Sequence, residues 1–177
     1  MRLLLLLTGA MLLLPAPGLA QNHEDHQQHA ERGPQALTAE RIEGLLAGEG
    51  LGYALPAELN SHPGPRHVLD LEDELDLSQE QVDAVTRIFQ EMNERARELG
   101  ARLVEAERDL DDLFRGGSAD AGELEELVHS IGRLEAELRY AHLEAHLRTT
   151  ELLTDDQIRC YDEERGHGQG HEMNHPH

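Results

Sequence analysis

The residues best suited to chemistry in this sequence of 177 residues are its 12 histidines. Two of them, His142 and His146, stand four positions apart in a segment with a helical pattern. On a helix this spacing places both imidazoles on one face, one turn apart, where two neutral ring nitrogens can share a metal ion. The alternative is that both side chains are solvated and only flank a helix contact narrowed by Ala141 and Ala145.

Two ligands do not make a tight metal site, so further donors are expected. Zinc, the metal we expect first, takes four ligands in a tetrahedron, whereas copper, nickel and cobalt accept other mixtures of nitrogen, oxygen and sulfur. If the chain folds back at the Gly-Gly pair near its middle, His142 comes roughly level with Glu91 and Met92, which offer a carboxylate and a thioether. The other expected ligands are His62 and His67, on a turn stiffened by prolines.

Most of the remaining histidines lie in two polar segments near the ends of the sequence. Residues 21–36 contain His23, His26 and His29, and residues 166–177 contain Met173 with His167, His171, His175 and His177. We expect both segments to be disordered without a ligand and to bind soft or borderline divalent ions weakly, with affinity lost as the histidines protonate below about pH 6. Biased composition without a function is the alternative, as is a purification tag, although the interspersed Gly, Glu and Asn argue against a tag. His129 stands alone and is expected at the surface.

Apolar residues at alternating steps of three and four predict two long helices that pair along a heptad seam. The first seam comprises Val82, Val85, Phe89, Met92, Ala96, Leu99, Leu103, Ala106, Leu110 and Leu113, and the second comprises Leu124, Leu127, Ile131, Leu134, Leu138, Ala141 and Ala145. Gly116-Gly117 separates them, which predicts an antiparallel hairpin folded at the glycines. A period of about 3.5 residues also implies a left-handed supercoil. The predicted fold class is all-α, a long helical hairpin with short flanking helices.

Matching helix-start signals flank this hairpin. Ser78 is placed to cap the first amides of the long helix, and Gln81, three positions on, to bond back to it. Thr154 and Gln157 repeat the arrangement after the hairpin, and Thr38 is a weaker copy. Shorter helices are expected at residues 38–48, 55–59 and 67–75.

Composition argues against several classes of function. The formal net charge is −21, with 36 acidic residues against 15 basic ones, all of them arginine. This charge repels phosphate, so nucleic acid is not expected as a partner. It suits cations or basic surfaces, although the solubility of a helical surface explains it equally well. No Ser/His/Asp order, glycine-rich phosphate loop or pair of catalytic acids is visible, so we do not expect an enzyme.

Residues 1–20 have the pattern of a cleavable signal peptide, with Arg2, an apolar run over residues 3–14 and a small-residue end at Ala20. The run is shorter than the roughly 20 residues that a membrane-spanning helix needs. No cysteine follows it for lipid attachment, so we expect a soluble exported protein with one helical domain at residues 37–165. Cys160 is either a free thiol or half of an intermolecular disulfide.

The paired Leu-Ser/Thr-x-x-Gln boxes, at residues 77–81 and 153–157, resemble the LTxxQ signature of the Spy/CpxP family. The resemblance covers roughly residues 69–165 and implies an all-helical protomer whose hairpins form a curved, cradle-like homodimer in the bacterial periplasm. In the metal-sensor branch of that family, histidines near the amino-terminal helix join a pair on the last long helix. The matching positions in this sequence are His142 and His146, with His62 and His67 as the other half.

Three functions are compatible with these features. The first is a periplasmic protein that senses or buffers a divalent transition metal, Zn, Cu, Ni or Co, in metal or envelope stress. The second is an ATP-independent periplasmic chaperone of the Spy type for unfolded envelope proteins, although its branch has a basic concave surface and this chain is acidic. The third is a repressor that docks on a membrane-bound sensor or anti-sigma protein. The histidine pair favours the first.

Overall fold

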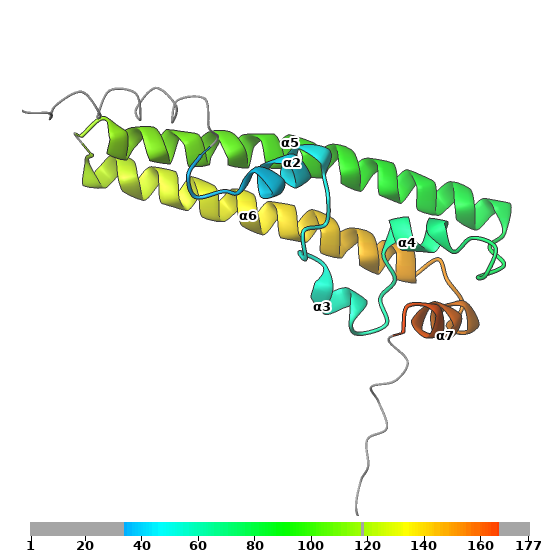
Figure 1. Cartoon of the computed structure of the whole chain (residues 1–177). Coiled ribbons are helices and arrows are strands. Elements are labelled where there is room, and N and C mark those ends of the chain that lie inside the picture. The colour runs from blue at the N-terminus through cyan, green and yellow to red at the C-terminus, as the bar shows by residue number, and fades with distance from the viewer. Residues whose placement is uncertain (1–33, 118, 167–177) are drawn as a thin grey trace, which may run out of the picture. The chain divides into compact units, whose positions relative to one another are not determined.

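A computed structural model describes residues 34–117 and 119–166, and these residues form helices, turns and loops without any strand. Two long helices, α5 (Gln79–Arg115) and α6 (Ala121–Thr150), run antiparallel and pack along their length (Figure 1). The all-α class and the hairpin are therefore confirmed. The predicted signal peptide and nearly all of the two histidine-containing segments lie outside the described residues.

Both predicted capping boxes are present. The Ser78 hydroxyl accepts a hydrogen bond from the Gln81 backbone, and the Gln81 side chain bonds back to the Ser78 backbone. Thr154 and Gln157 do the same at the start of α7 (Asp155–Glu164). The two boxes also bond to each other, because each glutamine amide donates to the other's Oε1, at 2.9 and 3.1 Å. The beginning of α5 is thereby joined to the beginning of α7.

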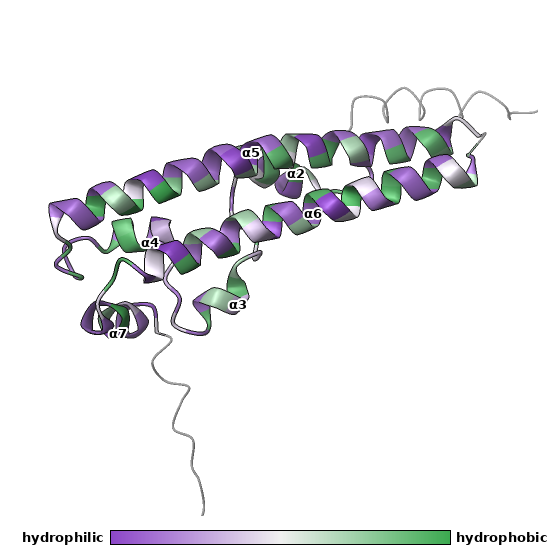
Figure 2. Ribbon diagram, turned by 180° about the vertical axis from the view of Figure 1, so that it is seen from behind, coloured by the Kyte–Doolittle hydropathy of each residue, from purple (hydrophilic) through white to green (hydrophobic). Residues whose placement is uncertain are grey.

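The hairpin core follows the predicted seams in part. Buried seam residues are Val85, Ala96, Leu99, Leu103 and Ala106 on α5, with Leu134, Leu138, Ala141 and Ala145 on α6. The other predicted seam residues, Val82, Phe89, Met92, Leu110, Leu113, Leu124, Leu127 and Ile131, are only partly buried. Helix α5 additionally buries Ile88, Gly100 and Val104. Its apolar face is wider than a seam because other helices pack against it, and Figure 2 shows green apolar bands between purple polar ones along both long helices.

Helix α2 (Ala39–Ala47) lies across the middle of α5. Thr38 caps its first turn, as predicted, and Gly48 ends it with φ 74°, a left-handed conformation that suits glycine. The contact with α5 is at Gly100, where a Cβ atom would lie 2.8 Å from the carbonyl carbon of Leu45. Only a residue without a side chain lets the two backbones come this close.

Two short helices follow, α3 (Leu55–Glu58) and α4 (Pro65–Asp70). The predicted helix at residues 67–75 is wrong at its end, because α4 stops at Asp70 and turns lead on to a positive φ at Asp76. This stretch is rich in carboxylates, which are unfavourable near the negative end of a helix. A second core cluster forms here from Val68, Leu75, Val85 and Tyr161. No helix among the described residues is long and apolar enough to cross a membrane.

Candidate metal centre

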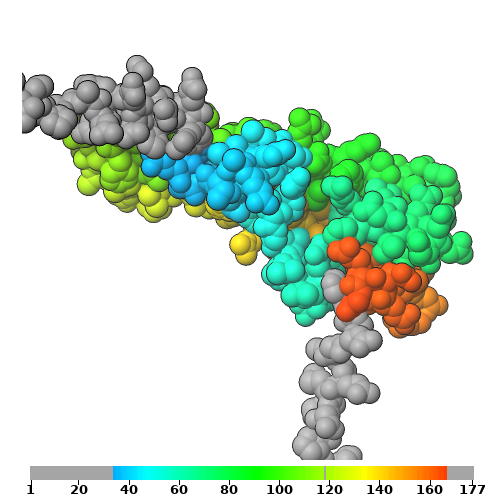
Figure 3. Space-filling model, viewed as in Figure 1, coloured from blue at the N-terminus to red at the C-terminus, as the bar shows by residue number. Residues whose placement is uncertain are grey.

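His142 and His146 are both buried on α6, with 2% and 5% of their surface exposed. They share one face, as their spacing predicts, and they are not the solvated pair of the alternative interpretation. Their cover comes from α3, α4 and the loop between α2 and α3, which gather with α7 toward the carboxyl end of α6 (Figure 3). The histidine pair therefore lies inside the domain.

Both histidines line a cavity of about 660 Å³. The potential donors on its wall besides them are His67, Glu58, Glu49, Asp70, Asn93 and Met92. These residues come from α3, α4, α5 and the loop after α2. The cavity brings together nitrogen, oxygen and sulfur donors that are up to about a hundred positions apart in the sequence.

The free ring nitrogen of His142 is the most unusual atom of this cavity. Its Nε2 is buried and has no hydrogen-bond partner within the described protein. The imidazole lies parallel to the ring of Tyr53, with 5.8 Å between centroids and 9° between planes. Burial, and then the neighbouring His146, lower the pKa of His142 to about 4. The ring is therefore neutral at pH 7, the state in which an imidazole can bind a metal.

His146 is held by the turn before α4. Its Nδ1 lies 2.8 Å from the carbonyl oxygen of His62, and because a carbonyl only accepts, Nδ1 carries the proton. Burial lowers the pKa of His146, and the bond to His62 partly opposes that shift. In the neutral ring the lone pair is then on Nε2. Metal-binding histidines usually donate their other ring N–H to a carbonyl or carboxylate in this way, which fixes the orientation of the ring.

Gly64 covers the ring of His146 closely. A Cβ atom at position 64 would lie 2.7 Å from Cε1 and 2.8 Å from Nε2 of that imidazole. The free nitrogen of His146 is thus shielded by backbone, and a ligand reaches it only when the turn shifts.

The structure separates the other predicted ligands. His67 lines the cavity, with its Nδ1 3.4 Å from Glu58, and burial, followed by the charge of Arg165, lowers its pKa. The ring of His62 instead lies 2.7 Å from the carbonyl oxygen of Asn60, and this residue supports His146 through its backbone.

Of the two donors expected from α5, only one faces the cavity. Met92 lines it, whereas Glu91 pairs with Arg148 at 2.9 Å across the hairpin. Glu58 on α3 also lines the cavity, and it is a carboxylate donor that the sequence analysis does not predict. No helical spacing links it to α6, so no local signal would have found it.

Tyr53 is held over His142 by a polar triangle. Its hydroxyl donates to Glu135 at 2.5 Å, and Arg41 donates to both the hydroxyl and Glu135 at 3.0 Å. Burial, and then the hydrogen bond to Glu135, raise the pKa of Tyr53 to about 12, so the hydroxyl stays protonated. The triangle links α2 and the loop after it to α6.

The donors at this centre suit a borderline transition metal without being assembled around one. Among residues 34–117 and 119–166, no three His, Cys, Asp or Glu side chains are close enough together to hold an ion. An unpartnered buried imidazole nitrogen beside a second neutral imidazole is nevertheless half of a site for zinc, copper, nickel or cobalt. The described residues thus offer donors that suit such a metal but do not gather three of them around one point.

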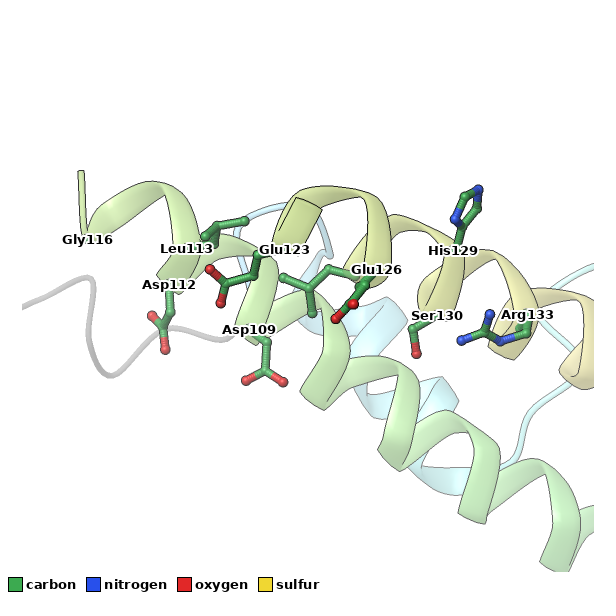
Figure 4. A pocket seen from close by; sticks show the side chains of 10 residues that line it. Asp109, Asp112, Leu113, Gly116, Glu123, Glu126, His129, Ser130 and Arg133 are labelled. Atoms are coloured by element: carbon green, nitrogen blue, oxygen red, sulfur yellow. The ribbon is translucent and has the colours of Figure 1, made fainter. Parts of the chain in front are cut away.

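A second cavity, of about 880 Å³, lies at the hairpin tip (Figure 4). Asp109, Asp112, Glu123 and Glu126 line it, and the ring of His129 points away from these carboxylates. His129 is exposed, which confirms the expectation of a surface residue. The tip is a solvated acidic surface, far along α6 from the histidine pair.

Comparison with known proteins finds a family match. A family model described as heavy-metal resistance matches residues 44–160, which include α3 to α6 and both buried histidines. No curated protein and no solved structure shows significant similarity to the chain. Because the matched region is well over half of the sequence, the chain belongs to the heavy-metal resistance family.

Proposed function

We propose that this protein binds a divalent transition metal through His142 and His146 and thereby senses or buffers that metal. The observation that carries the proposal is the buried, unpartnered Nε2 of His142 beside a second neutral imidazole on the wall of a cavity. Leaving a buried polar atom without a partner costs about 1–3 kcal/mol, which a ligand would recover. Zinc is our first choice, with copper, nickel and cobalt as alternatives.

The protein's own residues would supply the ring nitrogens and select the ion. His142 and His146 offer the nitrogens, and Met92, His67 and Glu58 on the same cavity wall widen the choice to oxygen and sulfur. With a further ligand from α3, α4 or α5, the metal would supply a strong bond between that element and α6. Because the turn at Gly64 has to move before the free nitrogen of His146 can bind, metal binding would favour the conformation in which that turn has shifted. A difference in affinity of that kind is what lets a ligand shift a conformational or partner equilibrium.

The proposal also includes a cellular location, an oligomeric state and a non-enzymatic role. We place the protein in the periplasm as a homodimer, on the support of the signal-peptide pattern at residues 1–20 and of the resemblance in the two boxes. Cell fractionation tests the location. Light scattering after size-exclusion chromatography, with and without zinc, tests the oligomeric state and its dependence on metal.

Calorimetric titration of the purified protein with zinc, copper, nickel and cobalt tests the metal site. The chain with His142→Ala or His146→Ala should lose the tightest binding event, and the matched control His129→Ala should keep it because that histidine is exposed at the hairpin tip. Circular dichroism establishes that the variants remain helical. If the unmodified protein binds none of the four metals more tightly than millimolar, the proposed function is wrong.

One observation favours a chaperone role as a second candidate. Leu55 and Leu59, in and directly after α3, and Leu46 on α2 are about half exposed. Exposed leucines are a means of holding unfolded segments of other proteins. Protection of a denatured client from aggregation at stoichiometric amounts, lost in the variant with all three leucines changed to serine, would support this role. Equal aggregation with and without the protein would exclude it.

A further inference from the structure

One buried hydroxyl near the metal centre lacks a hydrogen bond. Tyr161 on α7 is fully buried, and its hydroxyl has no hydrogen-bond partner among residues 34–117 and 119–166. Buried hydroxyls in proteins are ordinarily bonded, because their loss of contact with water is otherwise uncompensated. The Tyr161 hydroxyl therefore marks a place where a bond can form once a neighbouring group moves.

The neighbouring group is the backbone of Gly64. Burial raises the pKa of Tyr161, and the charge of Arg165 and then the backbone of Gly64 partly oppose that rise. A backbone group opposes it by directing its N–H at the phenolic oxygen, so the Gly64 amide faces the hydroxyl without completing a bond to it. The same residue covers the ring of His146, where a Cβ atom would lie 2.8 Å from Nε2. Gly64 is therefore close to a metal-binding nitrogen and to an unbonded hydroxyl at once.

The turn that carries Gly64 has the features of a segment that changes position. Ser61 has a φ of 58°, in the left-handed region that residues other than glycine rarely adopt. Backbone strain of this kind is concentrated in segments that switch between conformations. One hydrogen bond ties the turn to α6, from Nδ1 of His146 to the carbonyl oxygen of His62 at 2.8 Å. A strained residue at one end and a glycine at the other allow the segment between them to take a second position.

We propose that residues 61–64 form a latch with two positions, and that metal binding moves the latch from the first to the second. In the first position, which the structure shows, Gly64 shields Nε2 of His146. In the second, Gly64 has left that nitrogen and its N–H donates to the Tyr161 hydroxyl. The new bond offsets part of the cost of opening the site. This inference rests on the proposed function and deepens it, because it names α7 as the element that detects whether the centre is occupied.

Helix α7 is attached to the elements that a signal from the latch would have to reach. Tyr161 shares a core cluster with Val68 on α4 and with Leu75. Gln157, at the start of α7, bonds to the Leu75 carbonyl and to the capping box of α5. A change in the bonding of Tyr161 therefore acts on the packing of α4, α5 and α7 together.

The first test is Tyr161→Phe, with Tyr140→Phe as the matched control because that tyrosine is exposed. Without metal, Tyr161→Phe should not lower the free energy of unfolding in urea, since the hydroxyl that it removes is unbonded. Its affinity for Zn²⁺, or for whichever of Co²⁺, Ni²⁺ and Cu²⁺ the unmodified protein binds most tightly, should fall about threefold to tenfold in calorimetric titration, because the second position loses its new bond. The same metal should slow hydrogen exchange of the Gly64 amide in the unmodified protein and leave it unchanged in Tyr161→Phe.

The second test is Gly64→Ala, with Gly50→Ala as the matched control. Both glycines line the cavity, but a Cβ atom at position 50 has no other atom within 4 Å. The methyl group at position 64 collides with the ring of His146 only in the first position of the latch. Gly64→Ala should therefore bind the metal at least about fivefold more tightly, and Gly50→Ala should bind it as the unmodified protein does.

Unchanged affinity in Tyr161→Phe would overturn the latch. Unchanged or weaker binding in Gly64→Ala would do the same, since it would mean that the ring of His146 moves instead of the turn, and so would equal effects of a variant and its control. All these results leave the proposed function intact, because the metal still binds. Should Gly64→Ala fail to fold, Tyr161→Phe and the exchange of the Gly64 amide decide the question. Binding of none of the four metals more tightly than millimolar by the unmodified protein would refute the proposed function itself.

Discussion

Two glycines inside the long helices should respond in opposite ways to the same substitution. Gly100 in α5 is buried under α2, whereas Gly132 in α6 is exposed and has no atom within 4 Å of a Cβ placed on it. Replacing a mid-helix glycine by alanine ordinarily stabilises by about 0.8–1.0 kcal/mol, because the backbone loses less freedom on folding. We expect Gly132→Ala to show this gain.

At Gly100 the same gain is opposed by a collision with backbone. The new methyl would lie 2.8 Å from the Leu45 carbonyl carbon and closer still to its oxygen, and backbone cannot turn aside as a flexible side chain can. Overpacking of this kind costs about 1–3 kcal/mol. After the helical gain is subtracted, Gly100→Ala should lower the free energy of unfolding by up to about 2 kcal/mol, and the two variants should differ by about 1–3 kcal/mol.

Urea unfolding followed by circular dichroism measures both changes, and amide hydrogen exchange reports whether α2 opens locally instead. If α2 detaches, residues 39–47 should lose protection in Gly100→Ala and keep it in Gly132→Ala. Loss of α2 would also uncover His142, because Tyr53 reaches it from the loop after α2. Equal stabilisation of the two variants with unchanged protection of α2 would refute the packing of α2 on Gly100.

Three further predictions concern single contacts. Acidification from pH 7 to pH 5 should lower the free energy of unfolding by about 2 kcal/mol through His142, because the unfolded ring, with a pKa of about 6.5, takes up a proton that the folded ring, with a pKa of about 4, does not. Urea unfolding of His142→Phe at pH 7 and pH 5, with chelator present, should show a loss of stability that is smaller by this amount. A pH dependence equal to that of the unmodified protein would contradict the burial argument. Tyr53→Phe should lower the free energy of unfolding, measured with urea, by about 1–2 kcal/mol, since it removes the hydrogen bond to Glu135 and keeps the ring. An unchanged free energy of unfolding would mean that the hydroxyl contributes nothing to stability. A double-mutant cycle of Gln81→Ala and Gln157→Ala should give a coupling energy of about 1 kcal/mol between the capping boxes, and strict additivity would show that their amides do not interact.

Local rules were sufficient for the hairpin and its ends. The apolar period, the two capping boxes and the glycine pair each depend on residues a few positions apart. The starts of α5 after Ser78 and of α7 after Thr154 therefore follow directly from the sequence. The shared face of His142 and His146 follows from the same helical geometry. The predicted helix at residues 67–75 extends too far, because the carboxylates from Asp70 onward disfavour the continuation that the apolar spacing indicates.

The tertiary structure alone decided what surrounds the histidine pair. The sequence determined that two imidazoles lie one turn apart, but Tyr53 covers one of them, and the carbonyl of His62, 84 positions away in the chain, orients the other. Likewise Glu58 rather than Glu91 faces the cavity. Periodicity within a helix specifies which side chains share a face. Which loop lies on that face depends on packing between distant segments, and no local spacing encodes it.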